Sequence, residues 1–154
     1  MATAVTSQKI ASNWAIAAYD HDPGTTDATV TTNGTAIYWV PMRDHMGFGV
    51  IAKPTVVGGT GLTLVEIVGA TDSAGTDIAV ILSSGAVAGD ALADYVFIEV
   101  TDAQINEVGK AAGKDFDYVA ARLTMGTATD EASVVYIRGP AKRPQLNLTA
   151  TTIT

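Results

Sequence analysis

Few residues of this chain have side chains that could do chemistry, and most of those are acidic. Asp20, His21 and Asp22 are consecutive, and Asp44 precedes His45, the second of two histidines. Carboxylate and imidazole groups bind metals, but a metal site needs three or four ligands that converge on one point. Because adjacent residues in a turn seldom converge, we expect both segments to be solvated loops and predict no metal site.

A third acidic segment, residues 72–77, has some features of a calcium-binding loop. Asp72 and Asp77 flank Ser-Ala-Gly-Thr, but the segment lacks the alternating oxygen ligands and the distal Glu of an EF-hand. The residue types favour a hairpin turn whose aspartates accept hydrogen bonds from nearby backbone. Calcium binding in a loop of a β-sandwich stays open as the alternative.

Motifs for catalysis are missing from the sequence. It contains no cysteine and no Gly-x-Ser-x-Gly elbow, and Ser83-Ser84-Gly85 has no neighbouring base. The Gly58-Gly59-Thr60-Gly61 run lacks the lysine of a phosphate-binding loop and precedes a strand instead of a helix. We therefore expect no catalytic residues, no cofactor and no enzymatic activity.

Charge and hydropathy restrict the partners. The net charge of −7 argues against a nucleic-acid-binding surface, which needs clustered Lys and Arg. Apolar runs such as Leu62–Val68 are far shorter than the ~20 residues of a membrane-spanning helix. No charged start followed by an apolar core marks an export signal, so we expect synthesis in the cytoplasm of a cell that does not export this chain.

The elements that must position these residues are short strands separated by turn formers. The clearest alternation is in 118–125, where Val119, Ala121, Leu123 and Met125 fall on one face. Residues 95–100 place Val96, Ile98 and Val100 opposite Tyr95, Phe97 and Glu99. A helix is predicted from Thr101 or Asp102 to Ala112, ended by Gly113. Further strands are expected at 48–53 (ended by Pro54), 62–70 (covered on both faces), 78–82 and 132–138.

Local signals near the N-terminus predict a hairpin. Strand formers at 28–32 and 35–40 flank Asn33-Gly34, a pair that suits a type I′ turn. Residues 7–18 are alanine-rich, with Ile10 and Trp14 at helical spacing, which is compatible with a short helix or with an extended arm anchored by Trp14.

The complete pattern predicts one mainly all-β domain. We expect a β-sandwich or jelly roll of seven or eight strands over 21–139, with one or two short helices. Residues 1–20 would form an N-terminal arm or short helix, and 140–154 an extended tail. A tail that is only solvated has no need of Leu146, Leu148 and Ile153, so we predict that it pairs with a sheet edge of its own or a neighbouring chain.

Several further residues are candidates for contacts with other molecules. Arg138, Lys142 and Arg143 form the local basic cluster, which could dock on an acidic neighbour. Tyr38 and Trp39 lie on opposite faces of one predicted strand, so at least one of them is expected outside the core, where an aromatic ring could stack on a sugar.

The order of these features resembles a family of small phage virion proteins. The residues that carry the resemblance are Asn13-Trp14-Ala15-Ile16-Ala17-Ala18, Leu62–Ala70 followed by Thr71-Asp72-Ser73-Ala74-Gly75-Thr76, Tyr118–Thr124, Val134–Pro140, and Arg143-Pro144. The resemblance implies a structural role in the virion, of the head-decoration or cement type, with no catalytic residues to transfer.

These observations together predict a capsid decoration subunit that stabilises a shell by non-covalent contacts. Its partners would be the major capsid protein or other virion subunits, and it would form a homo-oligomer, with a trimer as one candidate. The predicted contact residues are Trp14, Trp39, Arg138, Lys142, Arg143, Leu146, Leu148 and Ile153. The alternative is a tail or fibre module that binds a host glycan or another receptor, with Tyr38 or Trp39 beside Asp44 and His45.

Overall fold

Two antiparallel sheets face each other in the computed structural model, which describes residues 15–21 and 29–31 as backbone and 38–142 in full. In spatial order, the first sheet contains β1 (Ala15–His21), β9 (Glu131–Arg138), β4 (Gly47–Val56) and β7 (Val96–Thr101). The second contains β2 (Thr29–Thr31), β8 (Tyr118–Met125), β5 (Leu62–Ala70) and β6 (Ala79–Ser83), and β3 (Val40–Pro41) also pairs with β8.

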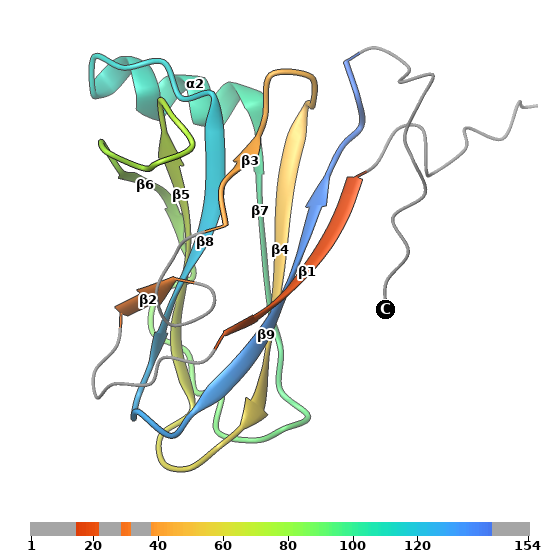
Figure 1. Ribbon diagram of the computed structural model, residues 1–154, viewed down its shortest axis with the longest axis vertical. Coiled ribbons are helices and arrows are strands. Elements are labelled where there is room, and N and C mark those ends of the chain that lie inside the picture. The colour runs from red at the N-terminus through yellow and green to blue at the C-terminus, as the bar shows by residue number, and fades with distance from the viewer. Residues whose placement is uncertain (1–14, 22–28, 32–37, 143–154) are drawn as a thin grey trace, which may run out of the picture.

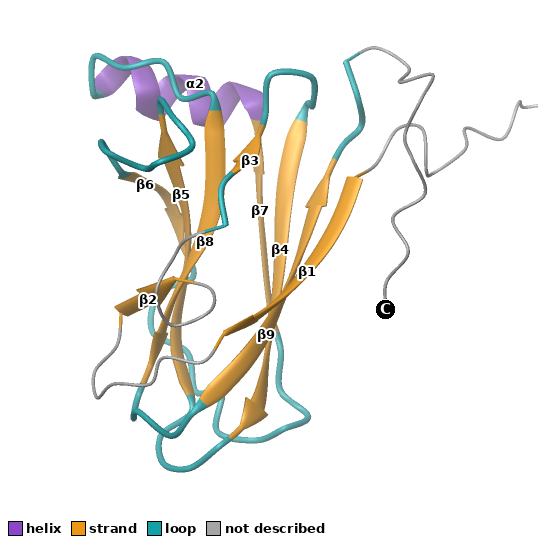
Figure 2. Ribbon diagram, in the orientation of Figure 1, coloured by secondary structure: helices purple, strands orange, loops and turns teal. Residues whose placement is uncertain are grey.

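The sheets form the two layers of a β-sandwich (Figure 1). Helix α2 (Asp102–Ala111) follows β7 and lies across one end of the layers. Figure 2 shows that strands dominate the described residues. The predicted all-β sandwich is therefore confirmed, although the described residues form nine strands instead of seven or eight. No helix among the described residues is long and apolar enough to cross a membrane.

Alternation along the strands builds the core. The inward-facing residues of β8 are buried as predicted, and those of β9, Ala132, Val134 and Tyr136, oppose them from the other sheet. The Tyr136 ring meets Phe48 edge to face, with a centroid distance of 5.0 Å. Its hydroxyl accepts a hydrogen bond from the Ala121 backbone N–H at 2.7 Å, so one residue joins the two sheets.

Strand β5 is central and covered on both faces, as its sequence predicted. It lies between β8 and β6, and even Glu66 on its polar face is buried. Because a buried charge needs a partner, Glu66 accepts a hydrogen bond from Arg122 Nε at 2.7 Å on the neighbouring strand.

The predicted helix is confirmed, with its cap. The Thr101 hydroxyl accepts the backbone N–H of Gln104, and the Gln104 side chain accepts the backbone N–H of Thr101, which completes a capping box. Gly113 follows the helix with φ +68, a conformation that favours glycine. Ile105 is buried and closes this end of the core.

At the opposite end, a buried carboxylate joins two turns. Asp130 is fully buried, and its Oδ1 accepts the backbone N–H groups of Gly58 and Gly59 at 2.8 and 2.9 Å. Its Oδ2 accepts those of Gly61 and Thr127 at 2.9 and 2.8 Å. Burial raises the pKa of this carboxyl, but the hydrogen bonds outweigh it and the net pKa is lowered. The glycine-rich run is thus the backbone cradle of a carboxylate.

For the N-terminal part the sequence left a short helix and an extended arm open, and residues 15–21 are extended. They form strand β1, which pairs with β9 from Ala15–Arg138 to His21–Ala132, so the sandwich begins before residue 21. Strands β2 and β3 both pair with β8, one after the other along its length. The hairpin between 28–32 and 35–40 stays a prediction, because residues 32–37 lie outside the described residues. The Asn33-Gly34 turn and residues 7–14 lie outside the described residues.

Strand β4 is longer than predicted because Pro54 does not end it. Pro54 stands opposite Ala132, and the register shifts between Pro54 and Val56. At such an irregularity a strand can include a residue that has no N–H to donate.

Candidate interaction surface

The outer face of the first sheet carries an apolar groove of about 570 Å³. Its sides include Met46 and Phe97, which are 54% and 50% exposed, and Ile137 of β9. The polar side chains of Glu99 and Gln104 lie at its rim, and Pro140 contributes at the end where the chain leaves β9. Exposed large apolar groups gathered in one hollow are typical of a surface that binds another molecule.

The glycines of β4 form the floor of this groove. Gly49 stands opposite Ile137 on one neighbouring strand and Glu99 on the other. A Cβ atom at Gly49 would lie 3.3 Å from the Phe97 ring, so the missing side chain leaves room for this ring beside β4. Glycine inside a strand marks a place where another group approaches the backbone closely.

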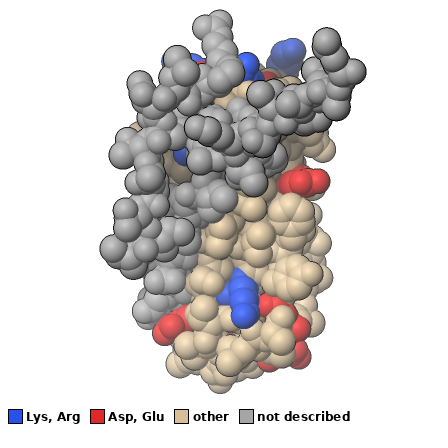
Figure 3. Space-filling model, turned by 90° about the vertical axis from the view of Figure 1, so that its right-hand side faces the viewer, with Lys and Arg blue, Asp and Glu red and all other residues tan. Residues whose placement is uncertain are grey.

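The apolar character continues along the sheet beyond the groove. Ile51 of β4 stands between Val135 of β9 and Phe97 of β7, and alternation places all three on the outer face. Figure 3 views this side of the molecule. Where described residues form its surface, uncharged groups predominate, with a basic group in the lower part and acidic groups near the margins.

After β9 the chain passes beside the groove and stays paired with the segment that precedes β4. Gly139 N–H donates to Gly47 O at 3.0 Å, Met46 N–H to Pro140 O at 2.9 Å, and Lys142 N–H to Asp44 O at 2.7 Å. The start of the predicted tail therefore extends the β4–β9 pairing of its own chain. Residues 143–154 lie outside the described residues.

His45 lies buried in this pairing, 5% exposed, opposite Ala141. Its Nδ1 has no hydrogen-bond partner among the described residues. Burial lowers the pKa of the imidazole, and the nearby charges of Arg138 and Lys142 lower it further, against the opposing effect of Asp44. The surroundings of His45 thus favour its neutral form. The described residues hold no group of three or more His, Asp or Glu side chains that could bind a metal ion.

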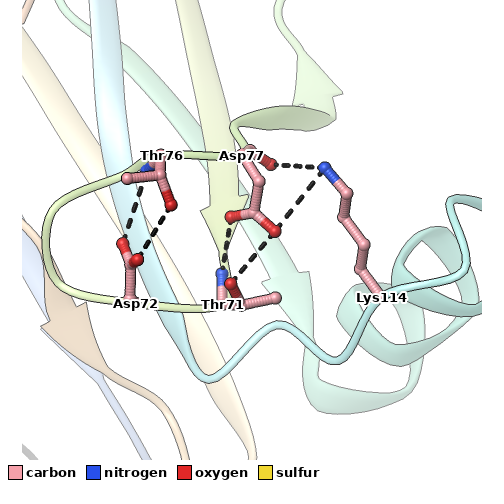
Figure 4. Close-up of polar contacts among 5 residues, drawn as sticks. All are labelled: Thr71, Asp72, Thr76, Asp77 and Lys114. Atoms are coloured by element: carbon pink, nitrogen blue, oxygen red, sulfur yellow. Dashed lines mark hydrogen bonds and ion pairs between the residues drawn. The ribbon is translucent and has the colours of Figure 1, made fainter.

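Both carboxylates of the 71–77 loop accept hydrogen bonds from groups of the loop itself (Figure 4). Asp72 Oδ1 accepts the Ala74 N–H at 3.0 Å, and its Oδ2 accepts the Thr76 hydroxyl at 2.8 Å. Asp77 accepts the backbone N–H and the hydroxyl of Thr71, both at 3.0 Å. Hydrogen bonds, from Thr76 to Asp72 and from Thr71 to Asp77, lower the pKa of both aspartates.

Lys114 completes this loop from the segment after α2. Its Nζ lies 3.5 Å from Asp77 Oδ2 and donates to the Asp77 backbone carbonyl at 3.2 Å. The aspartates point to donors of their own loop and to Lys114, and they do not converge on a common point. The turn stabilised by side-chain acceptors that the sequence predicted is the arrangement observed.

The predicted contact residues that the structure describes have partners within the chain. Arg138 Nη1 donates to the Pro41 carbonyl at 2.8 Å, and Lys142 Nζ lies 2.9 Å from Asp102 Oδ2. Trp39 is half-buried, and its ring lies against Gly75, where a Cβ atom would fall 2.5 Å from Cζ2. Tyr38 is also half-buried and packs against the core.

The remaining predicted residues cannot be placed. Trp14, Arg143, Leu146, Leu148 and Ile153 lie outside the described residues, as do the side chains of Asp20, His21 and Asp22. The groove residues Met46, Phe97 and Ile137 were missed as a site. The available signal was the alternation of β7, which puts the aromatic Phe97 on the face opposite the core.

The fold and the groove together define a β-sandwich domain with an apolar outer face. No protein-family model matches the chain, and comparison with curated proteins found no match. Two solved structures show distant similarity, each at 13% identity. The first comes from work on disulfide-linked pili of Bacillus endospore appendages (TM-score 0.32, covering 82% of this chain and 86% of that one). The second is the K2 cleaved adhesin domain of Lys-gingipain (TM-score 0.36, 82% and 88%). Neither similarity is close enough to support an argument about function.

Proposed function

We propose that this chain is a non-enzymatic structural subunit that binds other subunits of a larger assembly through the outer face of its first sheet. The observation that carries the proposal is the groove that Met46, Phe97 and Ile137 line on an otherwise acidic protein. A lone exposed apolar residue needs no explanation, but several around one hollow are a binding surface.

The chemistry of the described side chains favours a binding role over a catalytic one. The carboxylates with lowered pKa values all accept hydrogen bonds that hold loops together: Asp72 and Asp77 from their own loop, and Asp130 from the two turns that it joins. His45 is buried and has no acidic residue at hydrogen-bond distance of its Nδ1 among the described residues. A general base would need a reachable proton and a partner that orients it.

In its specific form, the proposal is the one that the sequence resemblance implies. The chain would decorate a phage capsid as a homo-oligomer, in contact with the major capsid protein, and many weak contacts repeated by symmetry would hold the shell. The negative charge of −7 would keep the unassembled protein soluble until it meets its partner.

The test uses shells that lack their decoration subunit. The full chain should bind to them and raise their melting temperature. Burying the exposed half of Phe97 removes ~100 Å² of apolar surface from water, which is worth ~2.5 kcal/mol. We therefore expect Phe97→Asp to weaken binding by at least ~50-fold.

Val80→Asp is the matched control, because Val80 is an apolar strand residue on the other sheet that is 40% exposed. It should bind the shells as the natural chain does. If the folded natural chain neither binds nor stabilises them, the decoration role is wrong. If Phe97→Asp binds normally, the groove is not the contact surface.

A further inference from the structure

The groove has the features of a site for an extended peptide. Its floor lies at Gly47 and Gly49, where β4 has no side chains, and its sides are the apolar groups of Met46, Phe97 and Ile137. A volume of about 570 Å³ accommodates more than one aliphatic side chain. The polar rim at Glu99 and Gln104 can meet the backbone or the polar side chains of such a peptide.

We propose that this groove binds residues 145–148 of a second copy of this chain. The segment reads Gln-Leu-Asn-Leu and follows Pro144, which favours an extended backbone. In an extended segment alternate side chains point to the same side, so Leu146 and Leu148 both face the groove while Gln145 and Asn147 face away. The inference rests on the proposed assembly function and names the contact that would build it.

The position of the segment favours this occupant. The described chain ends at Lys142, and Pro140, two residues earlier, lines the groove. Residues 143–154 can span up to ~40 Å when extended, which is enough to reach a neighbouring copy.

Charge favours it as well. Arg143 is the only charged side chain in 143–154, whereas the whole chain carries a net charge of −7. The segment therefore approaches an acidic partner without repulsion, and Arg143 is complementary to Glu99 at the rim.

A second copy fits better than the same chain. Residues 139–142 are held beside 44–47 by backbone hydrogen bonds, and Lys142 is paired with Asp102. A segment that arrives from a second copy can stay extended and deliver both leucines. Such a contact joins two different surfaces, so it closes into a ring when the rotation between copies permits.

The absence of cysteine makes a direct test possible, because single introduced thiols are the only reactive ones. Full-length Glu99→Cys and Leu148→Cys variants would be mixed and treated with a short bifunctional thiol reagent. Glu107→Cys, an equally acidic and exposed position on α2, replaces Glu99→Cys in the control mixture. A docked segment raises the local thiol concentration, so the first mixture should give heterodimers at least ~10-fold faster than the control.

The outcomes separate the possible occupants. Adding Phe97→Asp to the Glu99→Cys copy should abolish the cross-link, and adding Val80→Asp should not. Equal rates in the two mixtures overturn the proposal. So does cross-linking that occurs only within a doubly substituted chain, since the occupant is then the chain's own segment. If the natural chain still binds shells, only this contact is wrong; if it does not, the assembly function fails as well.

Discussion

Replacing Asp130 by Asn tests the reasoning about how the two turns at one end of the sandwich are held together. Each carboxylate oxygen of Asp130 accepts two backbone N–H groups, at distances between 2.8 and 2.9 Å. Asparagine has nearly the same shape, but one of its two acceptors becomes an NH₂ group. Two backbone donors would then face another donor.

The expected cost follows from what those donors lose. A buried N–H without a partner costs about 1–3 kcal/mol, so two of them suggest about 2–6 kcal/mol. Gly61 N–H is the fully buried donor, whereas the other three are partly buried and water can replace some of what they lose. We therefore expect a loss of about 2–4 kcal/mol, a large part of the 5–15 kcal/mol typical of a domain.

Urea unfolding at neutral pH measures this loss, with Asp115→Asn, an exposed aspartate, as the matched control. The melting temperature should fall by roughly 10 °C in Asp130→Asn and hardly change in the control.

The same carboxylate predicts a dependence on pH. Because the folded-state pKa of Asp130 is lowered from 3.8, its contribution to the free energy of unfolding is complete above that pH and is lost as the pH falls through the lowered value. The difference in the free energy of unfolding between the natural chain and Asp130→Asn should therefore become smaller over this range of pH. A loss below ~1 kcal/mol would refute the reasoning.

Two further predictions concern His45 and Gly75. The folded-state pKa of His45 lies below 6.5, so the unfolded chain binds the proton more readily and stability should decrease as the pH falls below that value. In His45→Gln, the melting temperature should depend less on pH over this range. Gly75→Ala combines φ +67 with a Cβ 2.5 Å from the Trp39 ring, and we expect a cost of about 2–4 kcal/mol in urea unfolding. Gly85→Ala, with φ +71 and no heavy atom within 4 Å of its Cβ, should cost about 1–2 kcal/mol.

The controls make both predictions refutable. Equal costs for the two glycine substitutions would show that Trp39 does not pack on the 71–77 loop. An unchanged pH slope in His45→Gln would assign the acid sensitivity to other groups.

Much of the β-structure could be predicted because local patterns determine it. Strand β8 was predicted to the residue, and α2 to within one residue. Both signals, period-2 alternation and a capping box, depend only on residues that are close together in the sequence. Long-range pairing decided what local signals leave open. Strands β2 and β3 each pair with β8, a partner that the residues around Asn33-Gly34 do not indicate. Similarly, the alanines of β1 are compatible with a helix in isolation, but β9 offers them a sheet edge.

By itself, the sequence determined the class of the domain: alternating apolar residues, frequent turn formers and a lack of reactive groups specify a β-sandwich with little chemistry. Only the tertiary structure decided the rest. The groove needs Gly49 of β4, Phe97 of β7 and Ile137 of β9, and the Asp130 cradle joins residues about 70 positions apart. Such contacts depend on the register between distant strands, and no local pattern of side chains encodes that register.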